Sequence, residues 1–552
     1  MGSNIRTLMS VKSLKFFLEN SFRKMLVAQM ILLGVCILIC SCILPVAPIK
    51  ILFLWPVPLL SHHRAFSPLI EELANRGHHI TAYTTVKREK LPPNYTEIII
   101  HPDNSGPKMG DFDLTSWRHK NNFQYLHEMY TFFGRMVEDA LGSPELKSLI
   151  RSNEKFDLVL AEFTFAQECL SAFGHKFSAS VINLNPLFAS PWLAQIAGIP
   201  HSFSYIPDFR LPYTDKMNFW QRAKNALLGS YEIAIGNLIF MPFHDRLVRK
   251  FFEYPGSTVK SYPPLKDLMA NISLHLLDSH PLVSSVRPYS PNVIDVGGMH
   301  IKTAGKLPQD LQTFMDEAAE GFIYFSFGSY IDGGKLPKRV HQIFAETLKG
   351  LKQRVVWKWN QQIEGGAPNI LIRPWLPQQE ILSHPNCRLF ITHGGFNSMI
   401  EVMNIGVPVL GVPFFSDQYH NVAVYEHMGV GLELDLEAAT VPYIKEKINR
   451  IIHTPAFKQN AKRIAELFKD QPETSLEKAL FWVEYVIRHK GAHHLKPASV
   501  KLSYYQYLLL DVIVFGIVSL SIVAYILYSA ARIFLSLFYT RPTDVKSKRK
   551  RE

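Results

Sequence analysis

The sequence predicts an α/β protein with two doubly wound domains and a C-terminal transmembrane helix. A strand–helix–strand pattern opens the body at residues 50–85, and short apolar strands separated by helical stretches return after residue 296. Strands that alternate with helices form a parallel sheet covered on both faces. The third observation is the uncharged run 512–531, which is long enough to cross the roughly 30 Å hydrocarbon core of a bilayer.

The first domain opens with three elements in order. We expect a strand at 50–57, a helix at 66–76 and a second strand at 79–85. The helix ends before Gly77, because glycine tolerates the left-handed conformation that terminates many helices. A further buried strand is expected at 156–161. This succession is typical of a parallel sheet.

The second domain is indicated by four apolar strands, at 322–326, 355–359, 389–392 and 407–413, with a helix that begins near Asn397. Runs of this length, rich in β-branched and aromatic residues, are typical of strands buried on both faces. The chain shows no repeat at a fixed period. We therefore expect a second sheet rather than a repeat architecture.

These patterns divide the chain into six parts. They are a signal segment at 1–47, a first domain at 48–290, a second domain at 291–490, a juxtamembrane segment at 491–511, the transmembrane run at 512–531 and a basic tail at 532–552. A basic head precedes the apolar run 25–44, which is typical of a secretory signal or of an uncleaved signal anchor. The basic tail favours the cytosolic side, so both domains are expected in the lumen.

The two ends also account for most of the net charge of +12. The basic pI therefore reflects membrane topology, and we expect no nucleic-acid partner. The terminal sequence 548–552 resembles a dilysine retrieval signal of endoplasmic reticulum membrane proteins, and a generic basic flank is the alternative. Asn94 and Asn271 each begin an Asn-x-Ser/Thr motif, so they are candidate glycosylation sites that suit a lumenal body. The sequence leaves homo-oligomerisation open.

One segment, 389–421, carries the strongest functional signal. Its first strand runs into His393-Gly394-Gly395 and then into a helix. The glycines let the backbone approach a ligand, and free amides at the start of the helix favour a phosphate. Glu401 lies on the same helix face as Asn397. The next strand ends before Asp417-Gln418, which places an acid and an amide at a neighbouring strand end.

This segment resembles the signature of the UDP-glycosyltransferases. The matching residues are His393, Gly394, Asn397, Glu401, Pro408, Pro413, Asp417 and Gln418. The resemblance extends from about residue 48 to the C-terminus and looks like that of an insect member of the family. It implies the GT-B fold, in which two Rossmann-like domains face each other across a cleft. It further implies that the first domain binds the acceptor and the second the UDP-sugar donor.

The resemblance assigns the donor site. Uracil is expected to stack on Trp375, for which a core aromatic is the alternative, and Glu401 is expected to accept from the ribose hydroxyls. The remaining residues implied for the donor are Ser329, Gln378, His393, Gly395, Asn397, Ser398, Asp417 and Gln418, the last two on the sugar hydroxyls. No cofactor and no metal are expected. Asp111-Phe112-Asp113 is interpreted as a solvated loop, and no metal-ligand spacing of cysteines exists.

The resemblance also implies a catalytic pair, with His62 as general base and Glu162 as the acid that orients it. The family carries aspartate where this chain has Glu162, which is one methylene longer. Three alternatives stay open. In the first, Ser61 and His62 only cap the first helix. In the second, His63 is the base, and in the third, Glu162 is a solvated strand end. The implied reaction is a single displacement that inverts the anomeric carbon.

The donor sugar is inferred from Asp278, which aligns with an arginine of vertebrate glucuronosyltransferases. A carboxylate facing glucuronate is unfavourable, so glucose is the expected sugar and glucuronic acid the alternative. Residues 190–275, rich in aromatics, are interpreted as the apolar wall of an acceptor pocket for small lipophilic alcohols or phenols, in a detoxifying conjugation. Within this region, 216–226 suits either a core stripe or a membrane-surface contact. A membrane-lipid glycosyltransferase and a noncatalytic lumenal carrier of lipophilic ligands are the rival functions.

Overall fold

The protein was analysed as a computed structural model that describes most of the chain. The described residues are 22, 24–25, 29–30, 48–101, 107–108, 117–163, 165–257, 259–302, 305–329, 331, 336–361 and 366–539. They fall into two units, residues 1–49 and 50–552. Most of the predicted signal segment, the Asp111-Phe112-Asp113 loop and the terminal 548–552 sequence lie outside the described residues.

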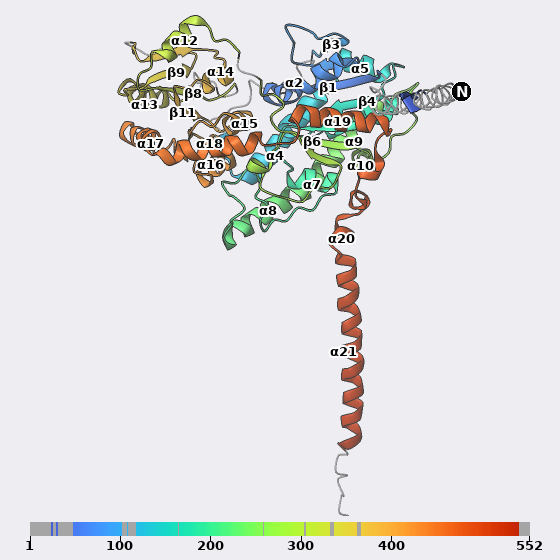
Figure 1. Cartoon of the computed structure of the whole chain (residues 1–552). Helices are drawn as coiled ribbons and strands as arrows, with labels where there is room; N and C mark the ends of the chain where they lie inside the picture. The colour runs from blue at the N-terminus through green and yellow to red at the C-terminus, as the bar shows by residue number, and fades with distance from the viewer. Residues whose placement is uncertain are drawn as a thin grey trace, which may run out of the picture. The chain divides into compact units, whose positions relative to one another are not determined.

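The first sheet has seven parallel strands in the order β3-β2-β1-β4-β5-β6-β7 (Figure 1). Its strands are β1 (Lys50–Trp55), β2 (His79–Thr84), β3 (Tyr95–Ile99), β4 (Leu158–Ala161), β5 (Ser180–Asn185), β6 (Leu274–Leu277) and β7 (Val293–Asp295). The helices between them are α2 (Leu60–Asn75), α4 (Asn122–Leu141), α5 (Pro144–Arg151), η2 (Glu168–Ser171), α6 (Ala172–Phe177), α7 (Pro191–Ala197), α8 (Phe219–Ile235), η3 (Gly236–Phe240), α9 (Met241–Phe252), α10 (Leu265–Ala270) and α11 (Pro281–Ser284).

The second sheet has six parallel strands in the order β10-β9-β8-β11-β12-β13. Its strands are β8 (Phe322–Ser326), β9 (Arg354–Lys358), β10 (Ile370–Arg373), β11 (Cys387–Thr392), β12 (Val409–Gly411) and β13 (Gly431–Glu433). The accompanying helices are α12 (Gln309–Asp316), α13 (Lys338–Lys349), α14 (Gln378–Leu382), α15 (Phe396–Ile405), α16 (Gln418–His427), α17 (Val441–His453) and α18 (Pro455–Lys469). The predicted pair of doubly wound sheets is therefore confirmed.

Both faces of the second sheet are buried, as its apolar strands predicted. Along β8, Phe322 and Tyr324 pack in one hydrophobic cluster, whereas Ile323 and Phe325 pack in another. Successive side chains of a strand point to opposite faces, so each cluster covers one side of the sheet. Helix α19 (Ser475–Arg488) then returns to the first sheet, where it packs against α2 and β5.

Two predicted boundaries were wrong because prolines interrupt the local pattern. Helix α2 begins at Leu60 rather than at residue 66. Strand β1 ends at Trp55, and the short connection between the two contains Pro56 and Pro58. Its first turn is polar and conceals the helical period that the apolar residues show only later. Strand β12 covers Val409–Gly411 rather than 407–413, since a proline precedes it and another follows its last extended residues.

The segment 216–226 does not form a core stripe. Phe219 is 63% exposed and Trp220 is 78% exposed at the start of α8, although Met217 is buried. Leu227 on the same helix is also exposed. Contact of this segment with a membrane surface stays a prediction.

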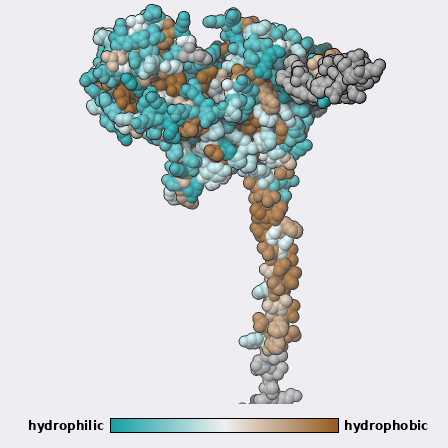
Figure 2. Space-filling view, in the orientation of Figure 1, coloured by the Kyte–Doolittle hydropathy of each residue, from teal (hydrophilic) through white to brown (hydrophobic). Residues whose placement is uncertain are grey.

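The C-terminal apolar run forms a single helix that is longer than predicted. The short turns η5 (His493–Leu495) and η6 (Ala498–Lys501) and the helix α20 (Tyr504–Tyr507) lead into α21 (Leu510–Phe538). An 18-residue stretch of this helix has a mean hydropathy of 2.4, the helix has no buried residue, and its surface is mostly hydrophobic in Figure 2. Residues 219–252 are also long and apolar enough for a span, but 39% of their most apolar 18-residue stretch is buried within the body. The helix α21 is therefore the better candidate membrane span.

The turn after β7 leads to a prediction about stability. A Cβ on Gly297 would lie 2.6–2.8 Å from backbone atoms of Ser279, which cannot move away as a flexible side chain would. We expect Gly297→Ala to cost about 1–3 kcal/mol, as overpacking does, and to lower the midpoint of thermal unfolding by several degrees. Gly350→Ala is the control, because its Cβ would meet the nearest atom at 3.6 Å. Equal midpoints for the two variants would contradict the prediction.

Candidate active site

A cleft of about 680 Å³ lies within the unit 50–552, at the carboxyl ends of strands from both sheets. Its lining includes residues at or just after the ends of β8, β9, β10 and β11, namely Gly328, Lys358, Trp375 and His393. Parallel strands bring their carboxyl ends to one edge, where open α/β sheets bind ligands. His62 and every residue that the sequence assigned to the donor site line this cleft.

The imidazole of His393 is held between two glycines. A Cβ on Gly328 would lie 2.6 Å from the His393 ring, and one on Gly395 would lie 2.4 Å from it. Burial lowers the pKa of His393 to about 3, and the nearby charge of Lys358 adds to this. The ring is therefore neutral at physiological pH and donates one N–H at most. Its Nδ1 is buried and has no hydrogen-bond partner among the described residues, and the residue lines the cleft.

The start of α15 offers backbone amides beside this imidazole. Gly395 is the N-cap and contributes no side-chain cap, and the first helical bond runs from Met399 N–H to the Gly395 carbonyl at 3.0 Å. The amides of 396–398 precede that bond, so the helix itself does not satisfy them. Together with the positive end of the helix dipole they favour an anion.

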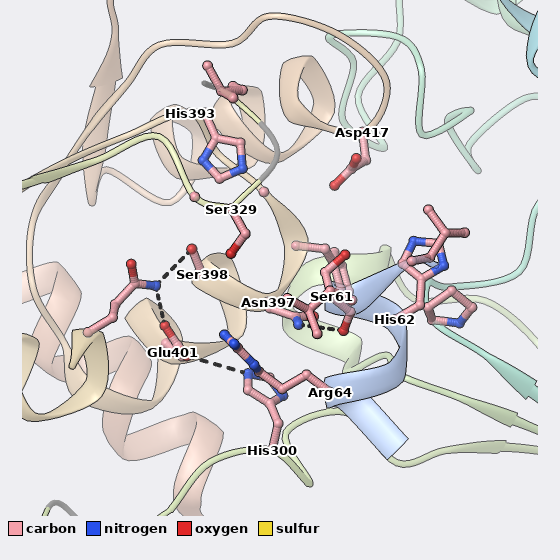
Figure 3. A pocket seen from close by; sticks show the side chains of 18 of the residues that line it. Ser61, His62, Arg64, His300, Ser329, His393, Asn397, Ser398, Glu401 and Asp417 are labelled. Atoms are coloured by element: carbon pink, nitrogen blue, oxygen red, sulfur yellow. Dashed lines mark hydrogen bonds and ion pairs between the residues drawn. The ribbon is translucent and has the colours of Figure 1, made fainter. Parts of the chain in front are cut away.

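A hydrogen-bond network orients Glu401. The Gln378 amide donates to Glu401 at 2.5 Å and to the Ser398 hydroxyl at 2.9 Å, and the Gln379 amide donates to the other Glu401 oxygen at 2.9 Å. Figure 3 shows the Ser398 and Glu401 contacts, with His300 3.8 Å from the carboxylate. The carboxylate is thereby fixed with acceptor oxygens at the cleft. Sequence reasoning missed Gln379, which the doubled glutamine after Pro377 could have indicated, and His300, for which the sequence motif gave no signal.

Trp375 is not a core aromatic, since 58% of it is exposed. It lines the cleft with the Lys358 ammonium 4.8 Å from its ring centre and the Arg64 guanidinium 5.5 Å from it. An exposed indole face of this kind is suited to stacking on a flat base. The position of Trp375 is therefore compatible with the predicted role as a base platform.

Asp417 and Gln418 enter the cleft from the turn that starts α16. The Gln418 side-chain oxygen accepts from the Phe414 amide at 2.8 Å and from the Phe415 amide at 3.3 Å, which leaves its NH₂ group for a ligand. Asp417 accepts from Asn421 at 2.7 Å. Burial raises the pKa of Asp417 to about 6, although the Asn421 hydrogen bond opposes the shift. The acid is mostly ionised at neutral pH and can accept from hydroxyl groups.

The structure joins His62 to Glu162, which lie 100 residues apart in the chain. His62 Nδ1 is 3.2 Å and 3.3 Å from the two Glu162 oxygens, and the Glu162 side chain is only 2% exposed. Glu162 is therefore a buried partner and not a solvated strand end. With Nδ1 engaged, Nε2 is the nitrogen left for a substrate proton.

Neither a capping role for His62 nor a catalytic role for His63 fits the structure. Ser61 and His62 do not cap α2, because the N-cap is Leu59 and no side chain caps the helix. His63 is buried against Phe53 and Trp55, with Nδ1 3.1 Å from the Ser67 hydroxyl, and it does not line the cleft. Burial lowers the pKa of His63 to about 4.

Asn397 links the two halves of the cleft. Its amide donates to the Ser61 carbonyl at 2.9 Å, which ties the start of α15 to the first turn of α2 (Figure 3). The sequence predicted this amide for the diphosphate. In the structure Asn397 lines the cleft, but its amide donates one hydrogen bond to the turn that carries His62.

Asp278 does not line the cleft, which corrects the sequence interpretation. It is fully buried, and one of its oxygens accepts from the Gly298 amide at 3.2 Å. Burial raises the pKa of Asp278, and the charges of His300 and His62 oppose the shift. Its carboxylate holds the turn after β7 and does not face a ligand in the cleft. Substitution by arginine would place a cation in the core.

The apolar part of the cleft comes from another region than predicted. No described residue of 190–275 lines it. The apolar lining near His62 is formed instead by Tyr125, Met129 and Phe133 of α4 with Phe165, Leu187 and Phe415. The Phe165 ring centre lies 5.3 Å from that of His62. The amphipathic pattern of α4 indicates a buried face, but no sequence signal places that face at this cleft.

Two further predictions concern sites outside the cleft. Asn94 and Asn271 are both exposed, so they are accessible, and their glycosylation stays a prediction. The described residues contain no cluster of three or more potential metal ligands.

The chain is similar to known proteins in sequence and in fold. The family model described as "UDP-glucoronosyl and UDP-glucosyl transferase" matches residues 111–544. The chain is 32% identical to UDP-glucosyltransferase 2 of Dactylopius coccus over 91% of this chain and 96% of that protein. It is 31% identical to UDP-glucuronosyltransferase 2C1 of Oryctolagus cuniculus over 89% of this chain and 99% of that protein. The solved glycosyltransferase VinC, in complex with DTDP, has a similar fold, with a TM-score of 0.52, 14% identity and coverage of 80% of this chain and all of that one.

The raised pKa of Asp417 predicts how one substitution changes stability with pH. The pKa of Asp417 is about 6 in the folded state and 3.8 ordinarily, so the folded state keeps the proton to a higher pH than the unfolded state does. This carboxyl therefore lowers the free energy of unfolding as the pH rises from 3.8 to about 6. We expect Asp417→Asn to unfold a few degrees above the wild type at pH 7.5, with the gain shrinking toward pH 4. Thermal unfolding at both pH values measures this, with Asp215→Asn, an exposed site, as control. A gain independent of pH would contradict the prediction.

Proposed function

Because the chain belongs to the UDP-glucuronosyl and UDP-glucosyl transferase family, we propose that it transfers glucose from UDP-glucose to a hydroxyl group of a small lipophilic acceptor. The observation that carries this proposal is the pairing of His62 with Glu162 in a cleft lined by all the predicted donor residues. A base, an apolar acceptor wall and a nucleotide cradle in one cleft are the parts that such a transfer needs.

In the proposed reaction His62 Nε2 takes the proton of the acceptor hydroxyl. The acceptor oxygen forms a bond to the anomeric carbon while the bond from that carbon to the UDP oxygen breaks, so the configuration inverts. Glu162 is buried and ion-paired through Nδ1, and it stabilises the imidazolium that results. The proton leaves the site with bulk water once the glycoside and UDP have departed.

In the proposed reaction, polar groups of the protein stabilise the negative charge that develops on the leaving UDP. The amides at the start of α15 are fixed before the reaction, as is the Ser398 hydroxyl, which accepts from Gln378, and Ser329 also lines the cleft. Fixed dipoles aimed at developing charge lower the barrier without reorganisation. The proposal therefore requires no metal and no cofactor.

The choice of glucose as the donor sugar rests on Asp417 rather than on Asp278. Asp417 lines the cleft, is mostly ionised at neutral pH and accepts hydrogen bonds, which suits neutral hydroxyl groups better than a sugar carboxylate. Glucuronic acid remains the alternative donor sugar, and a membrane lipid the alternative acceptor. The apolar residues of α4 that line the same cleft, and Phe165 beside His62, support a lipophilic acceptor in either case.

We further propose that α21 anchors the protein in the endoplasmic reticulum membrane with both domains in the lumen. The exposed apolar surface of α21 and the basic residues that follow it support this topology. Protease treatment of sealed microsomes tests it. Protection of the body with cleavage of the tail is expected, and cleavage of the body in intact vesicles would contradict it.

A donor panel with a base variant tests the proposed reaction. Microsomes containing the full chain are given UDP-glucose, UDP-galactose or UDP-glucuronic acid with a set of phenols and alcohols, and the glycosides are measured. We expect transfer of glucose, and a fall in kcat of about 10²–10⁴-fold in His62→Gln because the base is lost. UDP binding should be unchanged in this variant. His79→Gln, an exposed histidine on β2, is the matched control.

The outcomes separate the rival functions. Glucuronide as the main product would overturn the choice of glucose but not the reaction. UDP binding without product from any donor and acceptor pair would favour a noncatalytic carrier. Full activity in His62→Gln would remove the assigned base.

Replacing Glu162 by the family's own aspartate provides a second test. Both Glu162 oxygens lie within hydrogen-bond range of His62 in this chain. Removing one methylene withdraws them by about 1.5 Å, one carbon–carbon bond. We expect Glu162→Asp to lower kcat at least about tenfold while the KM for the donor stays the same. Wild-type kcat in this variant would show that the extra methylene has no role in positioning His62.

A further inference from the structure

Two cations from different sheets meet at Trp375. Arg64 belongs to the first turns of α2, and Lys358 is the last residue of β9. The Arg64 guanidinium and the Lys358 ammonium lie 5.5 Å and 4.8 Å from the indole centre. Neither residue was assigned to the donor site from the sequence. Both line the cleft.

Among the described residues, no carboxylate forms an ion pair with either of these two cations. Among the described residues Arg64 forms no ion pair, and Lys358 donates to the Gly328 carbonyl at 2.9 Å rather than to a carboxylate. Lys358 has a lowered pKa because it is partly buried and because Arg64 repels its charge. An anion placed between them would relieve this repulsion.

The four described carboxylates that line the cleft contact groups other than these two cations. Glu71 pairs with Arg88 at 2.6 Å, Glu401 accepts from two glutamines, and Asp417 accepts from Asn421. Glu380 accepts from the Gly305 amide at 3.4 Å. The cations are therefore left for a ligand, and the ligand that fits them is anionic.

The position of the pair selects the kind of anion. Trp375 is the proposed base platform, and Lys358 bridges it to the Gly328 loop that flanks His393. The diphosphate of a nucleotide stacked on that platform must pass between the platform and the amides of α15. This is the stretch that Lys358 borders.

We infer that Arg64 and Lys358 form a cationic clamp for the diphosphate of the nucleotide sugar, with Lys358 on the donor side and Arg64 on the acceptor side of the cleft. This inference rests on the proposed function, of which it assigns two further binding residues. Guanidinium and ammonium groups both bind phosphate oxygens with charge-assisted hydrogen bonds. In this role they neutralise the charge that grows on UDP as the glycosidic bond breaks.

The clamp also ties donor binding to the base. Arg64 lies two residues after His62 on α2, and the Ser61 carbonyl in the same turn accepts from Asn397 of α15. A nucleotide that engages Arg64 would therefore be bound by the same turn of α2 that carries His62. Figure 3 shows Arg64, Ser61 and His62 on this turn, facing the residues of α15.

The test compares UDP with uridine, which lacks the diphosphate. Binding of each to the full-length protein in detergent is measured by calorimetry for the wild type, Arg64→Ala and Lys358→Met. We expect each variant to bind UDP about tenfold more weakly, the usual effect of losing one charged hydrogen bond. Uridine binding should change less than about twofold, because uridine has no charge for the cations to bind. Arg64→Lys should recover part of the UDP affinity because it keeps the charge.

Arg246→Ala is the matched control, since Arg246 is an exposed arginine on α9 that makes no ion pair among the described residues and does not line the cleft. Thermal unfolding checks that each variant is folded. If Arg64→Ala does not fold, the comparison is made with Lys358→Met only. Equal losses for UDP and uridine would show that the cations only support the indole, and unchanged UDP binding would also overturn the clamp. If the wild type binds neither compound, the proposed function itself fails.

Discussion

The site depends on a topological constraint, which is that every strand pairing in both sheets is parallel. Parallel strands present all their carboxyl ends at one edge of the sheet, and each loop that leaves that edge can deliver a side chain to the same place. The cleft is built in this way from residues that follow β1, β8, β9, β10, β11 and β12. One hydrogen bond, from Asn397 to the Ser61 carbonyl, joins the first turns of the helices that follow β1 and β11.

Burial divides the roles of the ionisable groups. His393 is desolvated, so its pKa falls to about 3 and its ring is neutral, as the proposed role of a hydrogen-bond donor requires. Asp417 is also desolvated, but its pKa of about 6 leaves it ionised at neutral pH, where it accepts hydrogen bonds. His62 is part-exposed and paired with a buried carboxylate, which is the arrangement of a base. The surroundings of these three ionisable residues thus suit each of them to a different proposed role.

The glycines and the amide network serve the same end by fixing geometry before a ligand arrives. Gly328 and Gly395 leave no room for a Cβ on either side of the His393 ring, and Glu401 is held by Gln378 and Gln379. Preorganisation of this kind is how a protein stabilises a charged transition state, because its dipoles need not reorient during the reaction. In the proposed transferase the diphosphate would meet these groups already in place.

The sequence by itself determined the two sheets, the C-terminal apolar helix and the family, and it predicted donor residues that all line one cleft. These depend on local period and on motif spacing, which the linear order of residues preserves. Tertiary structure alone decided that His63 and Asp278 are buried away from the cleft, that α4 rather than 190–275 forms its apolar lining, and that Gln379, Arg64 and Lys358 belong to it. Periodicity shows that one face of an element is buried, but the partner that covers that face is fixed only when the sheets assemble.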